Sequence, residues 1–391
     1  QIFAAIYKNL GMMYVDTLDA SEVVGTGIKA MLRSLDPYTE YYASDEVKNL
    51  KQMLTGKYAG FGAIVRKNMK TGNVCIDEPY FGMPAQEVGL RKGDEIISID
   101  DSTMIGKDVS YVSSHLRGDA GSTFLLKYKR PGVKKELQVK VKRRAIQLPS
   151  VPYFGMLDDN VGYINLTQFT EGCAQEVRRA FIELRQQGMK GFIFDLRNNG
   201  GGSLQEAIKI VNLFVPRGLT LVKTKGKMSK VNHEYKTDSE PLDTVMPIVV
   251  MVNGSTASAS EITAGSLQDL DRAVVFGTRT YGKGLVQMPM DLPHNTSMKV
   301  TTSKYYIPSG RCIQEIDYSK NKKKTTDSIA ADTLGQRFTT ANGRVVYEGH
   351  GIKPDVEVKI DQMSILTIML YNKDMFAKFA DKFFYEHKKI A

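Results

Sequence analysis

PIVVMVNGSTASASEITAGSLQDL (residues 247–270) runs from an apolar segment through small residues into a helical pattern. The first seven residues are almost entirely apolar, which is typical of a strand covered on both faces of a sheet. Further strands are predicted over 161–166, 191–196, 273–277 and 298–307, and an amphipathic helix over 173–188. This alternation of strands and helices predicts an α/β core over residues 146–362.

The turn after this strand carries a candidate nucleophile. The stretch 253–287 contains four serines: Ser255, Ser258, Ser260 and Ser266. A serine in the first turn of a helix lies beside a backbone N–H that the helix leaves unpaired, and this N–H points where an oxyanion would form. Taken alone, the residues leave open whether one of these serines attacks a substrate or merely caps the helix.

A serine hydroxyl is a poor nucleophile without a base, and Lys283 is the candidate base. Neither His233 nor His294 lies in a comparable context, since both stand in polar, loop-like stretches. Burial of Lys283 among apolar neighbours could lower its pKa from about 10.4 to about 7.5, at a cost of roughly 4 kcal/mol. In an extended segment Gln287 would share a face with Lys283 and could hold its amine. The alternative is a solvated lysine in a glycine turn.

Residues 55–145 change to short strands punctuated by glycine. GFGA (60–63) and PAQEVGLRKGDEIISID (84–100), followed by a helix near 108–117 and a strand over 123–130, resemble a PDZ domain. The resemblance implies an open sheet edge beside a helix, where a partner's C-terminal tail adds as a strand. It implies that the amides of Phe61, Gly62 and Ala63 receive the tail carboxylate, whereas the alternative is a simple glycine turn.

The ends of the chain are predicted to be helical. Residues 1–54 show helical spacing up to LDPYTEYY (35–42), and we expect a packing or dimer arm there rather than a catalytic unit. Residues 363–391 predict a helix apolar enough to need a partner surface, and 315–342 an exposed polar insertion.

The bulk composition limits the classes of protein that this sequence can represent. A chain of 391 residues predicts two or three domains. Five His and three widely spaced Cys argue against a rich metal site and a disulfide framework. The net charge of +10 lies in scattered stretches such as 140–145 and 319–327, which favours solvated loops over nucleic-acid binding. No 18-residue uncharged apolar run is present, so membrane association would need a segment absent from this sequence.

The whole of residues 253–287 is similar to the catalytic segment of carboxyl-terminal processing (tail-specific) serine peptidases. GYINLTQF (162–169), GFIFDLRNNGGGSLQEAIKIVNLFV (191–215), YYIPSGRCIQ (305–314) and GHGIKPDVEV (349–358) resemble other landmarks of that family, in its order. The resemblance covers essentially the whole chain. It implies a multidomain α/β protein: an N-terminal helical arm, a PDZ domain, an αβ spiral core of the crotonase and ClpP kind, and a C-terminal helix.

The resemblance also implies site residues. The family's nucleophile precedes its lysine by 25 residues, which corresponds to Ser258 and Lys283 in this sequence, and Gln287 matches a supporting glutamine. The implied oxyanion hole is the amide of Ala259 with that of Gly201, or of Gly202 as the second choice. No cofactor or metal is implied. The sequence departs from the family at two positions, with Gly200 where proline is common and Cys312 where serine is common.

The implied function is cleavage of proteins recognised by their C-terminal tails. Arg117, at the end of the predicted PDZ helix, is a candidate link for gating the protease core. Family habit implies export to the periplasm or the outer face of a membrane, and the apolar terminal helices suggest a homodimer.

Two alternatives stay open. The first is a non-catalytic PDZ scaffold that binds C-termini without cutting them, although the joint presence of Ser258, Lys283 and Gln287 counts against it. The second is a crotonase-type enzyme that uses glycine amides on coenzyme A thioesters. No recognisable adenine or phosphate site accompanies NNGGG (198–202), and such a ligand would not need a PDZ region.

Overall fold

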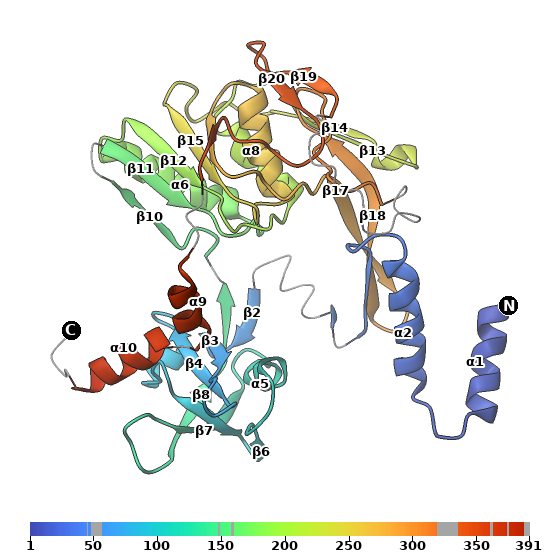
Figure 1. The fold of residues 1–391 in the computed structure, drawn as a ribbon, viewed down its shortest axis with the longest axis vertical. Coiled ribbons are helices and arrows are strands. Elements are labelled where there is room, and N and C mark those ends of the chain that lie inside the picture. The colour runs from blue at the N-terminus through green and yellow to red at the C-terminus, as the bar shows by residue number, and fades with distance from the viewer. Residues whose placement is uncertain are drawn as a thin grey trace. The chain divides into compact units, whose positions relative to one another are not determined.

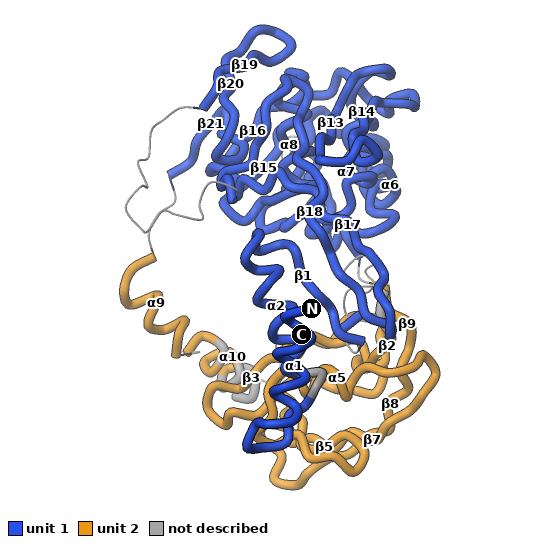
Figure 2. The backbone as a smooth tube through the Cα atoms, turned by 90° about the vertical axis from the view of Figure 1, so that its right-hand side faces the viewer, with its two compact units in different colours: residues 1–56, 149–359 blue, residues 57–148, 360–391 orange. Residues whose placement is uncertain are grey.

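The computed structural model describes residues 1–44, 46–47, 57–147, 149–157, 160–318, 335–359, 363–373 and 375–386. The chain divides into two units, residues 1–56 with 149–359 and residues 57–148 with 360–391 (Figure 2). Residues 319–334 of the predicted polar insertion and 48–54 of the predicted arm lie outside the described residues. The predicted multidomain α/β class is confirmed.

The first unit is built on a six-stranded sheet (Figure 1). Its first two strands pair antiparallel and all later neighbours pair parallel, as expected where helices connect the strands. The predicted strands of the α/β core are present. In sheet order the strands are β10 (Tyr153–Met156), β11 (Val161–Asn165), β12 (Gly191–Asp195), β15 (Ile248–Val252), β16 (Val274–Gly277) and β21 (Val356–Glu357).

Three helices accompany this sheet: α6 (Cys173–Gln186), α7 (Leu204–Asn212) and α8 (Ala259–Asp269). All eleven residues of α8 are buried, and Gly265 lets the side chains of Ile307 and Ile352 approach this helix closely. The rings of Phe181, Phe192 and Phe214 pack with centroids 5.2–5.7 Å apart within the same core. The strand-turn-helix of residues 247–270 therefore lies at the centre of the unit, which fixes the turn between β15 and α8.

A second sheet in this unit includes part of the N-terminal region. Strand β1 (Glu40–Tyr42) pairs antiparallel with β18 (Thr296–Tyr306). The helical spacing was expected to end at LDPYTEYY (35–42), but the strand over residues 40–42 was not predicted, because it depends on pairing with a distant strand. The other strands of this sheet are β13 (Thr220–Gly226), β14 (His233–Lys236) and β17 (Leu285–Leu292). Outside the sheet, the unit contains the hairpin of β19 (Arg337–Thr339) and β20 (Val345–Tyr347). It also contains the short helix η2 (Ser229–Val231) and the helices α1 (Ile2–Met13) and α2 (Ala20–Arg33).

The second unit contains a six-stranded antiparallel sheet with its own apolar core. Strand β3 (Ala63–Lys67) lies at one edge of the sheet, and α5 (Val109–Leu116) packs beside it. The remaining elements are β4 (Val74–Pro79), β5 (Glu95–Ile99), β6 (Ser102–Thr103), β7 (Thr123–Lys129), β8 (Leu137–Lys142), α4 (Pro84–Glu87), and the pair β2 (Lys57–Gly60) and β9 (Arg144–Gln147).

The C-terminal segment forms two helices, α9 (Ile365–Asn372) and α10 (Met375–Glu386), where the sequence pattern predicted one. Within the described residues, no helix is long and apolar enough to cross a membrane.

Candidate active site

Ser258 occupies the turn between β15 and α8 in an unusual backbone conformation. Its φ is 58° and its ψ is −117°, a region that non-glycine residues rarely adopt and that costs of order 1–3 kcal/mol. The glycine loop packs directly against this turn, since a Cβ placed on Gly201 would lie 2.8 Å from Ser258 Cβ and 2.6 Å from the Ala257 carbonyl oxygen. Only glycine permits so close an approach, so the loop and the turn fit each other.

The structure separates the four candidate serines. Ser260 and Ser266 are fully buried, and their hydroxyls donate to the backbone carbonyls of Asn199 and Leu221. Ser255 is exposed and lies outside the cavity that Ser258 lines. Only Ser258 thus combines the strained turn with access to a cavity.

Glu261 anchors this turn to the segment that carries the lysine, and the sequence interpretation missed it. Its carboxylate accepts from the backbone N–H groups of Ser258 (2.9 Å), Gly282 (2.7 Å) and Lys283 (2.8 Å), and from the Thr280 hydroxyl (2.5 Å). Burial raises the pKa of Glu261, whereas its four donors favour the ionised form. The spacing Ser258-x-x-Glu261 is that of a capping box, a signal that could have identified this residue.

Lys283 lies two residues before β17, and its side chain lines the same cavity as Ser258. The Tyr305 hydroxyl lies within hydrogen-bonding reach of the carbonyls of both Lys283 and Ser258, which ties the two segments together again. The Lys283 ammonium sits 4.5 Å from the centroid of the Tyr38 ring. In the part of the chain that is described, no hydrogen bond joins the Lys283 amine to the Ser258 hydroxyl.

The charge of Lys283 is disfavoured by its surroundings. Burial and the nearby Lys299 ammonium lower the pKa of Lys283, and the carboxylates of Glu40, Glu261 and Asp36 oppose this shift. Lys299, which also lines the cavity, pairs with Glu40 at 2.7 Å. The sequence had indicated burial as the cause of a lowered pKa, but not the second lysine.

Gln287 reaches the same cavity from β17, but its amide is used elsewhere. Gln287 Nε2 donates to Thr301 Oγ1 at 3.2 Å, and Thr301 in turn donates to Asp36 at 3.2 Å. A bulge between Val286 and Gln287 interrupts the pairing of β17 with β18, so the simple alternation expected from Lys283 to Gln287 does not hold.

The glycine loop offers two possible amides near Ser258. The Gly201 N–H already donates to Asn199 Oδ1 at 2.9 Å. Among the described residues, neither the Gly202 N–H nor the Ala259 N–H has a hydrogen-bond partner. In this conformation the N–H groups of Gly202, in the loop, and of Ala259, at the start of α8, are therefore available to a new acceptor.

These groups surround one cavity of about 740 Å³. A pocket of this size accommodates a peptide segment of a few residues. It is lined by Ser258, Ala259, Lys283 and Gln287, by the loop residues Gly200, Gly201 and Gly202, and by Phe169, Lys299 and Tyr305.

The predicted tail-binding residues lie at the start of β3 in the second unit. Gly62 has φ +78°, and a Cβ there would lie 2.4 Å from Met83 Cβ, so this turn requires glycine. The turn is held because Phe61 O accepts from Ala85 N–H at 2.7 Å. Arg117 forms the C-terminal cap of α5. It belongs to a different unit from Ser258, and its predicted link to the core stays a prediction.

The chain is similar to known proteins over both units. The model for Peptidase family S41 matches residues 160–319, and that for the PDZ domain matches residues 60–141. A carboxy-terminal-processing protease of Bartonella bacilliformis is 33% identical over 340 residues, which is 86% of this chain and 76% of that protein. A probable CtpA-like serine protease of Staphylococcus haemolyticus is 32% identical over 308 residues, 78% of this chain and 61% of that protein.

A solved structure described as the photosystem II D1 C-terminal processing protease has 26% identity and a TM-score of 0.49, covering 92% of this chain and 87% of that chain. The resemblance drawn from the sequence is confirmed. The chain belongs to peptidase family S41, among the carboxy-terminal-processing serine proteases, and carries a PDZ domain.

Proposed function

We propose that this chain is an endopeptidase in which Ser258 is the nucleophile and neutral Lys283 is its base. The observation that carries this proposal is the single buried carboxylate of Glu261, which holds the backbones of both residues at the edge of one cavity. Because both backbones are fixed to the same anchor, movement of the Lys283 side chain alone is enough to bring the base to the nucleophile, as general-base catalysis requires.

In the proposed reaction Ser258 Oγ attacks the scissile carbonyl carbon while its proton passes to Lys283 Nζ. The lysine then gives this proton to the leaving amine as the C–N bond breaks, which leaves an acyl-enzyme. Water attacks the ester, its proton passes through Lys283 to Ser258 Oγ, and the new carboxyl end departs. Before the first step the lysine side chain must swing from Tyr38 toward Ser258.

The oxyanion would be stabilised by the amides of Ala259 and Gly202. Both N–H groups lack partners among the described residues, and Ala259 begins a helix whose dipole favours negative charge at that end. The Gly201 amide, the first choice from the sequence, would contribute only after releasing Asn199 Oδ1.

Tail recognition is proposed for the second unit. Strand β3 is an edge strand beside α5, so an extended tail could pair with its open edge, with its carboxylate at Phe61, Gly62 and Ala63. Gln287 would support the Lys283 amine after leaving Thr301. An exported location stays a proposal from family habit. A homodimer is also proposed, and it is supported by the exposed apolar face of α1, where Ile2 is 79% exposed.

The test is digestion of an unstructured protein that ends in small apolar residues, with a matched substrate whose tail ends in two aspartates. Wild type should cleave the first substrate much faster, and Ser258→Ala should bind it without cleaving it. Equal cleavage of both substrates would refute tail recognition. Binding without cleavage by the wild type would instead favour the scaffold that binds C-termini.

Replacing Lys299 with methionine should move the acidic limb of the pH–rate profile to higher pH. The Lys299 charge lowers the pKa of Lys283, and its removal also leaves the nearby Glu40 carboxylate without its cationic partner, so both changes favour the ammonium. Because the reaction needs neutral Lys283, the midpoint should rise by about 0.5–1 unit. Lys223→Met, which breaks an exposed ion pair with Glu234, is the control. An unchanged midpoint in Lys299→Met would contradict the prediction.

A further inference from the structure

We propose that Tyr38 is a positioning residue for Lys283, whose ring holds the lysine ammonium away from Ser258 in a resting arrangement. This inference rests on the proposed roles of Ser258 and Lys283. It assigns a site function to the N-terminal region, where the sequence pattern indicated only a packing arm. The turn over residues 36–39 would then control how readily the base becomes available.

The ammonium of Lys283 contacts the face of the Tyr38 ring. Lys283 Nζ lies 4.5 Å from the Tyr38 ring centroid, within the range in which an aromatic face attracts a cation. Burial raises the pKa of Tyr38, so the contact is with a neutral ring. The ring is held in place by Tyr318, which packs edge-on at 6.1 Å, and by the Tyr281 hydroxyl at 3.5 Å. The ring face therefore stabilises the protonated lysine at a position with no bond to Ser258.

The turn over residues 36–39 is also linked to Gln287, through Thr301. Asp36 shapes the turn by accepting from the backbone N–H groups of Tyr38 and Thr39, both at 2.8 Å. It also accepts from Thr301 Oγ1, the hydroxyl to which Gln287 Nε2 donates. The turn thus contacts Lys283 directly, through Tyr38, and is linked to Gln287 through Thr301.

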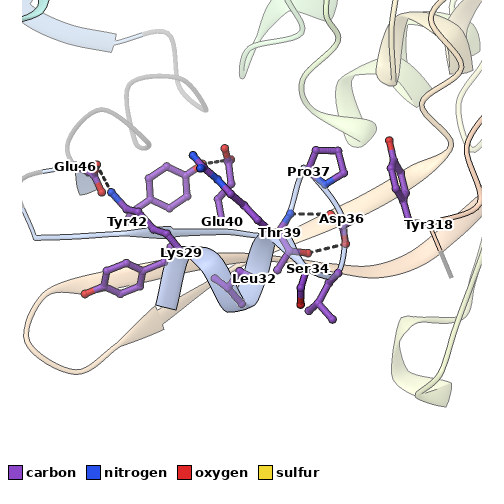
Figure 3. A pocket seen from close by; sticks show the side chains of 13 residues that line it. Lys29, Leu32, Ser34, Asp36, Pro37, Thr39, Glu40, Tyr42, Glu46 and Tyr318 are labelled. Carbon is purple, nitrogen blue, oxygen red and sulfur yellow. Dashed lines mark hydrogen bonds and ion pairs between the residues drawn. The ribbon is translucent and has the colours of Figure 1, made fainter. Parts of the chain in front are cut away.

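A second cavity lies beside the turn over residues 36–39. Pro37 and Thr39 line a second cavity of about 740 Å³, and Figure 3 shows Asp36 bonded to Thr39 at its wall. The turn is therefore open on this side, and on the other it is held to β18 by hydrogen bonds from Thr301 to Thr39 and Asp36. Movement of the turn would withdraw Tyr38 from the lysine.

The Tyr38 ring and the charged groups around Lys283 together determine how readily the lysine is protonated. The charged groups that face it come from four elements: Asp36 from the turn, Glu40 from β1, Glu261 from α8 and Lys299 from β18. Burial and Lys299 oppose the ammonium, whereas the three carboxylates and the ring favour it. Removing the ring without removing the apolar volume should therefore make the lysine a neutral base at lower pH.

The test is the rate at which a fluorophosphonate labels Ser258 between pH 5 and 10. Tyr38→Leu should lower the acidic midpoint by about 0.5–1 unit and speed labelling roughly three- to tenfold below the midpoint. Tyr38→Phe keeps the ring face, so its midpoint should match the wild type. Tyr153→Leu, at an exposed tyrosine on β10, controls for loss of a tyrosine elsewhere in the unit.

An unshifted midpoint in Tyr38→Leu would overturn the inference, and so would a shift in Tyr38→Phe as large as that in Tyr38→Leu. Loss of labelling at every pH in a folded Tyr38→Leu would also overturn it, because the ring would then assemble the site rather than restrain the lysine. If the wild type is not labelled at Ser258 at any pH, the failure lies in the proposed dyad and not in the role of Tyr38.

Discussion

Lys283→Met is expected to slow acylation of Ser258 by about 10²- to 10⁴-fold while the protein stays folded. Methionine keeps most of the apolar stem of the lysine but cannot accept a proton, so the hydroxyl loses its proposed base. The lowered pKa of Lys283 means that its charged form is not needed for stability, and the thermal midpoint should hold or rise. Stopped-flow or slow labelling with a fluorophosphonate measures the rate directly.

Lys209→Met is the matched control for this change. Lys209 lines the same cavity but is exposed and pairs with Glu206 at 2.7 Å. The hydrogen bond to Glu206 raises the pKa of Lys209, which favours the ammonium over a neutral base. Its replacement should change the labelling rate less than about threefold, because Lys209 has no part in the proposed proton transfer and the buried Glu206 carboxylate keeps the Ala174 N–H as a donor. If Lys283→Met and Lys209→Met lost labelling rate to a comparable extent, labelling would depend on the positive charge of the cavity and not on a lysine base.

Glu261→Gln is expected to impair both stability and chemistry. The four groups around the Glu261 carboxylate all donate: the N–H groups of Ser258 and Lys283 to one oxygen, and the Gly282 N–H with the Thr280 hydroxyl to the other. Whichever way a glutamine amide is turned, its NH₂ group faces at least one of these backbone N–H groups. Leaving such buried donors unpaired costs about 3 kcal/mol in the free energy of unfolding. The thermal midpoint should fall by roughly 5–10 °C. The labelling rate of Ser258 in the folded fraction should fall by about 10²-fold, because the Ser258 turn and the lysine segment lose their common anchor.

Asp269→Asn separates these two effects. Asp269 is a buried carboxylate at the other end of α8, paired with Arg311 at 2.7 Å and absent from the cavity lining. Its replacement should also lower the thermal midpoint, but labelling of the folded protein should stay near the wild-type rate. A Glu261→Gln variant that labels as fast as Asp269→Asn would contradict the anchoring role.

Patterns local in sequence predicted the core well. The strands over 161–166, 191–196 and 247–253 follow from continuous apolar runs, and the turn at Ser258 follows from small residues between a strand and a helix. The separate apolar core of residues 57–148 was likewise indicated by its glycine-punctuated strands. In each case neighbouring residues determine the element, so the sequence carries the signal.

What the sequence did not predict depends on contacts between distant residues. Strand β1 exists because it pairs with β18, more than 250 residues away in the chain. That pairing brings Tyr38 to Lys283, a contact that no local pattern indicates. The Gly201 amide is occupied by Asn199, an outcome of the loop's exact backbone path rather than of its composition. Glu261 was within reach of a local pattern but was not singled out.

Mass analysis of the covalent adduct shows whether Ser258 is the nucleophile. Wild type, Ser258→Ala and Ser260→Ala are treated with a fluorophosphonate, and the modified peptide is identified in each. One adduct is expected, at Ser258, in wild type and in any folded Ser260→Ala, and none in Ser258→Ala. An adduct on another residue of the wild type, or equal modification of Ser258→Ala, would contradict this assignment.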